Sequence, residues 1–276
     1  MIAVGVAAAA VGFGVALVLV PLRIAHAPSA LVRTNVSNRE VPVVLGGPLV
    51  VGGLAGVAAL GALAALGAED ALPSRMAGAV VILLCAMYLA GAYDDRRGAE
   101  AASGFSGHLT AARSGALTGG AVKAVAGALA GAAAGTLVSE GRVVVEVAVL
   151  CALSANLVNL LDRAPGRAGK VVLILWLPLV PLGHAAWLVA SAGVVGALLA
   201  CLRVDLSERA MLGDAGANPL GAVAGLGLAA ALDEPGRLVA IALLLALNLA
   251  SERWSFSRAI ERLTWLRALD DLGRRK

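Results

Sequence analysis

The segment Met76–Arg97 reads MAGAVVILLCAMYLAGAYDDRR and decides the fold class of this chain. It carries no charge from Met76 to Tyr93, and then Asp94 and Asp95 are followed at once by two arginines. An apolar run of this length is typical of a helix that crosses a lipid bilayer. Charges at the mouth of such a helix are costly to place, so we interpret the adjacent carboxylates as a functional site rather than an acidic helix end.

Apolar runs of similar length recur along the whole chain. Of its 276 residues 60% are hydrophobic and only 14% are charged, whereas soluble proteins carry about a quarter charged residues. The many glycines and alanines favour close packing between helices. We therefore predict an all-α, polytopic membrane helix bundle, with residues 1–250 as the transmembrane domain and 251–276 as a cytoplasmic tail. About nine spans are expected, at residues 2–22, 43–66, 76–93, 118–138, 143–161, 169–183, 185–202, 219–232 and 237–250.

The distribution of Lys and Arg predicts the orientation of these spans. With the N-terminus outside, all but three of the 22 basic residues fall in segments that face inward, as the positive-inside rule requires. The first apolar run has no basic residue before it, so we expect a retained helix rather than a signal peptide. The net charge of +4 follows from this topology and calls for no nucleic acid as a partner.

Carboxylates lie next to span ends in three of the inward segments. These are Asp94 with Asp95, then Asp162, then Asp214. Such a cluster is suited to a divalent cation and phosphate groups, because magnesium prefers one or two carboxylates plus phosphate oxygens. Two further inward carboxylates, Asp205 and Glu208, belong to no motif, and we expect them to contribute charge alone.

Two motifs accompany these carboxylates. Asn156, Asn159 and Asp162 recur at a spacing of three, which places them along one helix face; the alternative is that the asparagines form hydrogen bonds between helices. The loop after Asp162 supplies cations for phosphates. In Gly213-Asp214-Ala215-Gly216 the glycines free the backbone to approach a ligand, although the segment also reads as a simple loop before a helix with Pro219 in its first turn.

In this order, Asp94-Asp95, Asn156-x-x-Asn159-x-x-Asp162 and Gly213-Asp214-x-Gly216 resemble the motifs of the polyprenyl-phosphate N-acetylhexosamine-1-phosphate transferases. That superfamily includes phospho-MurNAc-pentapeptide transferase and the UDP-GlcNAc:undecaprenyl-phosphate transferases. The resemblance implies a magnesium-dependent transfer of a sugar-1-phosphate from a UDP-sugar to polyprenyl phosphate, with release of UMP. It also implies a bacterial plasma membrane, a cytoplasmic active site and a role in building the cell wall, such as its peptidoglycan.

The resemblance further implies a role for each matching residue. Asp214 is expected to bind Mg²⁺, and the catalytic residues are Asp94, Asp95 and Asp162. Lys123, Asn156 and Asn159 are expected to bind substrate. His108 and Arg167 are expected to contact it too, because they lie in inward loops.

The chain also departs from the pattern of that superfamily. Pro165 stands where a second Asp is usual, Gly127 replaces a Gln, and Ala217 replaces a Ser. The only histidines are His26, His108 and His184, so the usual His cluster of the last cytoplasmic loop is missing. The identity of the sugar is therefore open. Whether the chain forms a homodimer is open as well. The alternative is a catalytically inactive relative that binds lipid phosphate or a cell-wall partner. A transporter is disfavoured, because its charges would gather near the bilayer midplane rather than at one face.

The C-terminal tail shows apolar residues at helical spacing, with Arg and Asp between them. These are Phe256, Ile260, Leu263, Leu266, Leu269 and Leu272. The pattern predicts an amphipathic helix on the inner leaflet, or a helix that binds a partner.

Overall fold

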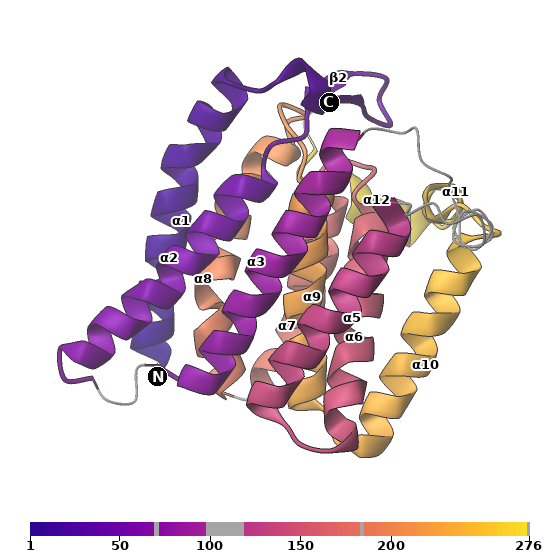
Figure 1. The fold of residues 1–276 in the computed structure, drawn as a ribbon. Helices are drawn as coiled ribbons and strands as arrows, with labels where there is room; N and C mark the ends of the chain where they lie inside the picture. The colour runs from indigo at the N-terminus through magenta and orange to yellow at the C-terminus, as the bar shows by residue number, and fades with distance from the viewer. Residues whose placement is uncertain (69–71, 98–118, 183–184, 275–276) are drawn as a thin grey trace.

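A computed structural model describes residues 1–68, 72–97, 119–182 and 185–274. In these ranges the protein is an all-α bundle whose long helices stand side by side (Figure 1). The long helices are α1 (Ile2–Ala25), α2 (Gly46–Ala65), α3 (Ser74–Arg97), α5 (Gly119–Val138), α6 (Arg142–Leu161), α7 (Arg167–Leu182), α8 (Ala185–Asp205), α9 (Asp214–Ala231) and α10 (Glu234–Ser251).

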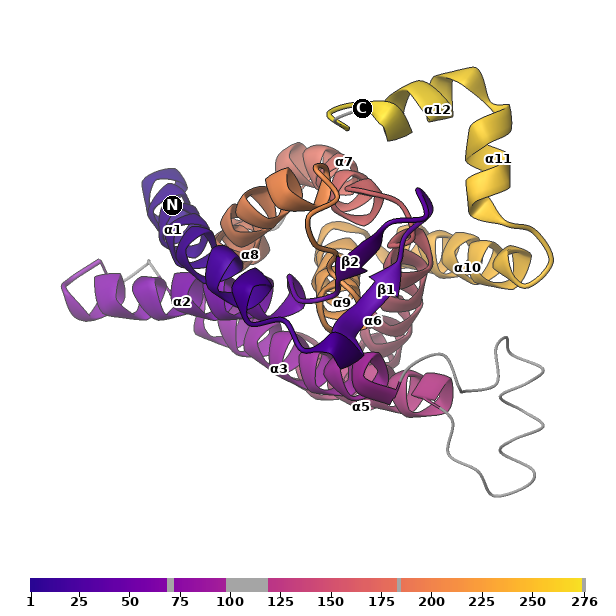
Figure 2. The same cartoon turned by 90° about the horizontal axis from the view of Figure 1, so that it is seen from above.

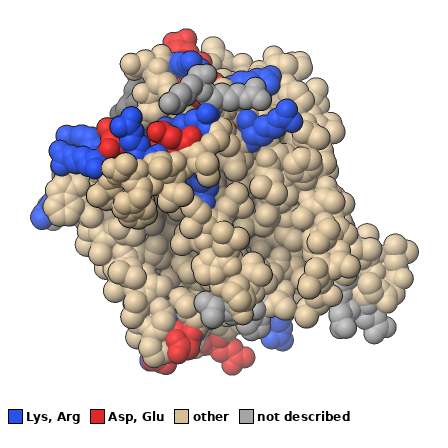
Figure 3. All heavy atoms as spheres, turned by 180° about the vertical axis from the view of Figure 1, so that it is seen from behind, with Lys and Arg blue, Asp and Glu red and all other residues tan. Residues whose placement is uncertain are grey.

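Each predicted span falls on one of these helices. Among the described residues, six helices are long and apolar enough to cross a membrane, namely α1, α2, α3, α6, α8 and α10. Charged side chains gather at the two ends of the molecule, with a broad uncharged band between them, and Lys and Arg dominate one end (Figure 3). The all-α architecture is thus confirmed, and by length and composition its apolar helices are compatible with a multi-pass membrane protein.

Helix α9 is the central helix of the bundle. It lies among α3, α6, α7 and α8 in the view from above (Figure 2), and nearly all its residues from Ala215 to Ala229 are buried. A Cβ atom on Gly225 would lie only 2.5 Å from the carbonyl oxygen of Leu150 in α6. The helix begins at Asp214 rather than at residue 219 as predicted. Because protein rather than lipid surrounds it, α9 tolerates Asn218 and several glycines in its length.

A short hairpin precedes α2 at the end of the bundle that carries most of the basic residues. The one-turn helix η1 (Ser29–Leu31) leads into β1 (Val32–Thr34), which pairs antiparallel with β2 (Glu40–Pro42). Two main-chain hydrogen bonds attach the segment before α9 to this hairpin: Met211 N donates to Pro42 O (2.9 Å), and Leu45 N donates to Met211 O (3.0 Å). The hairpin, which the sequence analysis did not predict, therefore fixes where α9 begins.

The tail forms two short helices instead of the one predicted. Helix α11 (Phe256–Arg262) and helix α12 (Thr264–Asp271) are separated at Leu263, whose backbone is extended. Both lie at the same end of the bundle as the hairpin (Figures 1 and 2). The tail is therefore bent at Leu263.

Candidate functional site

Three distant segments of the chain meet at the N-terminus of α9. Gly213 N donates to Asp162 Oδ2 over 2.8 Å. The two amides that follow donate to the two oxygens of Asp95, from Asp214 N over 3.0 Å and from Ala215 N over 2.9 Å. The end of α3, the end of α6 and the start of α9 are thus joined by side chain to backbone contacts.

Two glycines allow the main chains to come this close. A Cβ on Gly91 of α3 would lie 2.2 Å from Asp214 O, so only glycine fits there. Gly213 has φ +68°, a left-handed conformation that favours glycine, and a Cβ there would lie 2.0 Å from Val43 Cγ1. Backbone geometry at this crossing therefore explains Gly213 of the motif, as well as Gly91.

Asp95 acts as a cap for a helix other than its own. The first amides of a helix have no partner within that helix, and a carboxylate that accepts from them also meets the positive end of the helix dipole. Both oxygens of Asp95 are used in this way. A catalytic role was predicted for Asp95; in the structure its two oxygens cap α9 and fix the position of Asp214.

Lys123 of α5 lies between two of the predicted carboxylates. Its Nζ is 2.7 Å from Asp94 Oδ2 and 2.5 Å from Asp214 Oδ2. The three side chains are 19–20% exposed, so they are accessible to a ligand yet partly shielded from water. The ammonium offsets the repulsion between two carboxylates that point at the same place.

Asp94 and Asp214, which both contact Lys123, are the residues that could hold a metal ion at this site. Asp94 and Asp214 direct hard oxygen atoms to one point, and Mg²⁺ binds proteins through one or two carboxylates and takes its other ligands from water and phosphate. Among the described residues, no group of three or more Asp, Glu, His or Cys side chains could hold a metal ion. An ion at this point would therefore depend on Asp94, Asp214 and the substrate.

Asp162 and Asp205 form a second, buried pair of carboxylates. Burial raises the pKa of Asp162 well above its usual value of 3.8, and the charge of Asp205 raises it further. Asp205 is 2% exposed and accepts a hydrogen bond from the Gly166 amide, while its Oδ2 has no partner among the described residues. Asp205 was expected to contribute charge from outside the matched motifs; the structure places that charge close to Asp162.

The remaining predicted residues lie elsewhere. Asn156 Nδ2 donates to Asn248 Oδ1 of α10 over 2.5 Å, which is the inter-helix bond given as the alternative. Asn159 is half-buried and has no side-chain hydrogen bond to another described residue. Arg167 is buried and binds Asp270 of the tail. His108 lies outside the described residues.

Two contacts were not predicted from the sequence: the burial of Asp205 close to Asp162 and the ion pair of Asp270 with Arg167. Asp205 precedes the glycine motif but lies in no recurring pattern, and Asp270 gave no sign that it would meet Arg167. A scan against models of protein families finds no match to this chain, and a search of curated proteins finds no relative.

Proposed function

We propose that this protein transfers a sugar-1-phosphate from a UDP-sugar to polyprenyl phosphate and releases UMP. The observation that carries the proposal is the convergence of Asp94, Lys123 and Asp214 with Asp162 at the start of α9. Phosphoryl transfer demands positioning and charge neutralisation more than covalent participation by the protein. The contacts to Lys123 supply the positioning, and a cation held by the two carboxylates would supply the charge neutralisation.

The reaction forms one P–O bond and breaks another. An oxygen of the lipid phosphate attacks the β-phosphorus of the UDP-sugar, and the bond from that phosphorus to the α–β bridging oxygen breaks, so that UMP leaves. Asp94 orients the attacking phosphate and accepts its proton if one is present. Lys123 offsets the negative charge of the phosphates, and Asp162 holds the Gly213 amide in place beside them.

Asp214, with Asp94 beside it, is the residue we assign to magnesium. When bound, the ion supplies charge neutralisation to the diphosphate. The chain itself holds the carboxylates of Asp94 and Asp214 in place. Asp95 contributes by capping the helix that starts at Asp214.

The membrane arrangement is part of the proposal. We assign all nine long helices as spans, with the basic end of the bundle on the cytoplasmic side of a bacterial plasma membrane. The exposed Trp254 and Trp265 and the arginines of the tail suit the interface with an anionic leaflet. The product would then enter assembly of the cell envelope.

The test is UMP release by the purified protein with undecaprenyl phosphate, magnesium and a panel of UDP-sugars. We expect release that requires both lipid and metal. Release without the lipid would indicate hydrolysis of the nucleotide sugar instead. No release with any sugar would refute the transferase.

Specific observations favour one alternative, a non-catalytic relative that binds lipid phosphate. Pro165 stands where the resembling enzymes have a second Asp, Asp95 is used as a cap, and Arg167 is occupied by Asp270. Lipid-phosphate binding that depends on Lys123, in a protein without turnover, would select this alternative.

A further inference from the structure

Helix α12 is attached to the bundle by polar contacts. The helix has no buried residue, and its apolar side chains are exposed, Trp265 by 64% and Leu272 beside it by 65%. Apolar burial therefore contributes little to holding it. Its position depends on the hydrogen bonds that its last turn makes.

Asp270 is the centre of these contacts. Its two oxygens each accept a 2.8 Å hydrogen bond from Arg167 of α7, from Nε and from Nη2, and Arg274 Nη2 donates to Oδ2 over 2.6 Å. The side chains of Arg167 and Asp270 are only 6% and 9% exposed. Arg167 Nη1 also donates to Ser257 Oγ over 2.9 Å, which ties α11 to the same guanidinium.

Lys170, one turn after Arg167, completes the attachment. Its Nζ donates to the carbonyl oxygens of Leu269 and Leu272, both over 3.2 Å, and to that of Asp270. Both cations belong to the first turn of α7 and remain with the bundle if the tail leaves. Arg167 would then lose both of the charge-assisted hydrogen bonds that it makes to Asp270, which leaves its guanidinium open to another anion.

We infer that Arg167 and Lys170 form an anion-binding site that takes a phosphate group, and that Asp270 fills this site from within the chain. The planar guanidinium fork binds carboxylate and phosphate in the same bidentate way. A phosphate that binds there therefore displaces Asp270 and releases α12. The inference rests on the proposed function only where it names a lipid as the carrier of the phosphate. Binding of the phosphate itself requires no catalytic turnover.

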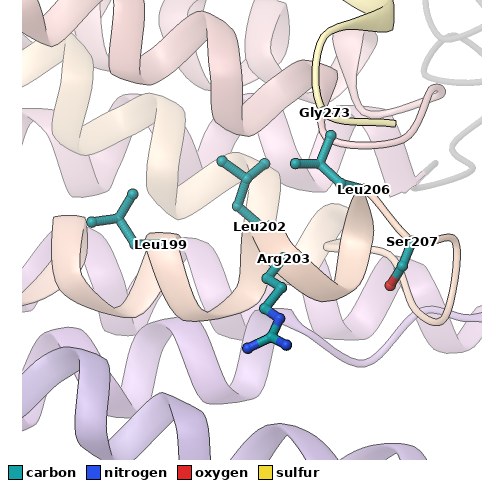
Figure 4. Close-up of a pocket in the computed structure, with 6 residues that line it drawn as sticks. All are labelled: Leu199, Leu202, Arg203, Leu206, Ser207 and Gly273. Carbon is teal, nitrogen blue, oxygen red and sulfur yellow. The ribbon is translucent and has the colours of Figure 1, made fainter. Parts of the chain in front are cut away.

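The surroundings of this site connect it to the acidic cluster. Arg274 Nε donates to Pro165 O over 3.3 Å, so the tail touches the loop that follows Asp162. Next to it lies a cavity of about 360 Å³, which Gly273 and the end of α8 line. Leu199, Leu202 and Leu206 point to one side of α8 there and Arg203 to the other (Figure 4). An apolar surface beside a phosphate site suits a phosphate carried by a lipid.

Hydrogen exchange of residues 264–272 in the full chain, held in nanodiscs, tests the attachment. We expect Asp270→Asn to speed exchange about tenfold, since an amide keeps one of the two acceptor oxygens and loses the charge. Asp271→Asn is the matched control, because Asp271 is 48% exposed and, among the described residues, its ion pairs are with arginines of the tail. Equal effects of the two variants would overturn the role of Asp270.

The same measurement with added phosphate tests the site itself. Inorganic phosphate is compared with sodium chloride at equal ionic strength, because salt alone weakens ion pairs, and nanodiscs with phosphatidic acid are compared with phosphatidylcholine. A saturable rise in exchange with inorganic phosphate assigns the site to free phosphate, and a rise with phosphatidic acid alone assigns it to a lipid headgroup. Unchanged exchange in both arms overturns the inference, whether or not the protein releases UMP.

Discussion

Two carboxylates on the basic side of this bundle, Asp95 and Asp270, are held in opposite ways. Asp95 meets main-chain amides at a point where a glycine of α3 touches the backbone of α9. Asp270 meets the long side chains of Arg167 and Arg274, at the end of a helix that has no buried residue. The partners of Asp95 cannot move without unfolding α9, whereas those of Asp270 can exchange it for another anion. The first arrangement suits a fixed reaction centre and the second suits a releasable contact.

The largest effect is expected from the carboxylates that face Lys123. Asp94→Asn and Asp214→Asn should each slow UMP release about a hundredfold or more, the scale lost with a positioned acid–base or charge-stabilising group. Asp214→Asn should also raise the magnesium concentration needed for half-maximal rate, because it removes a hard oxygen ligand.

Asp95→Asn tests whether Asp95 positions Asp214 or takes part in the reaction itself. It removes one of two acceptor oxygens from the cap of α9, so we expect a loss of about 0.5–2 kcal/mol in stability and a smaller rate loss than for Asp94→Asn. If Asp95→Asn proved the slowest variant at an unchanged melting temperature, our assignment of Asp95 as a cap would be wrong.

A smaller effect is expected at Lys123. Lys123→Gln should slow UMP release about tenfold to a hundredfold, because the phosphates lose one fixed positive charge. It should also lower the magnesium concentration for half-maximal rate, since Asp94 and Asp214 are freed of a competing cation. Titration of rate against magnesium measures both, and a requirement for more magnesium would contradict the idea that lysine and metal compete.

The crossing of α3 and α9 offers a test of stability alone. Gly91→Ala places a methyl group against the backbone of Asp214, and such overpacking costs about 1–3 kcal/mol. The melting temperature in detergent should fall accordingly. Gly61→Ala in α2 is the control, because a Cβ there has no neighbour within 4 Å. Equal melting temperatures for the two variants would show that the crossing is less tight than it appears.

The sequence alone predicted much of this architecture. Apolar run length placed each long helix of the described residues, and the positions of Asp94, Asp162 and Asp214 next to predicted span ends were enough to expect them close together. The hairpin at residues 32–42 was missed because its strands are only three residues long and show no alternation that could be recognised. The position of Asp205 was missed for a different reason. Its burial depends on how the loop after Asp162 folds back, and no local pattern encodes that contact.

The smallest effect concerns the pH dependence of the rate. Burial and the charge of Asp205 raise the pKa of Asp162, so an ionised Asp162 becomes available only as the pH rises through that raised value. Asp205→Asn removes the neighbouring charge, which lowers the pKa of Asp162 and should move the acid limb of the rate profile to lower pH. An acid limb at an unchanged pH would mean that the two carboxyl groups titrate independently, or that Asp162 is not needed in ionised form.

The central claim is that the cluster at the start of α9 transfers phosphate from nucleotide to lipid. The most direct measurement uses a UDP-sugar labelled on its β-phosphate, incubated with the purified protein, undecaprenyl phosphate and magnesium, and then partitioned between organic and aqueous phases. The label should move to the lipid phase as UMP accumulates in water, and Asp94→Asn should abolish the transfer while Asp271→Asn leaves it unchanged. Label that remains in water, as sugar phosphate or as intact UDP-sugar, would contradict the account.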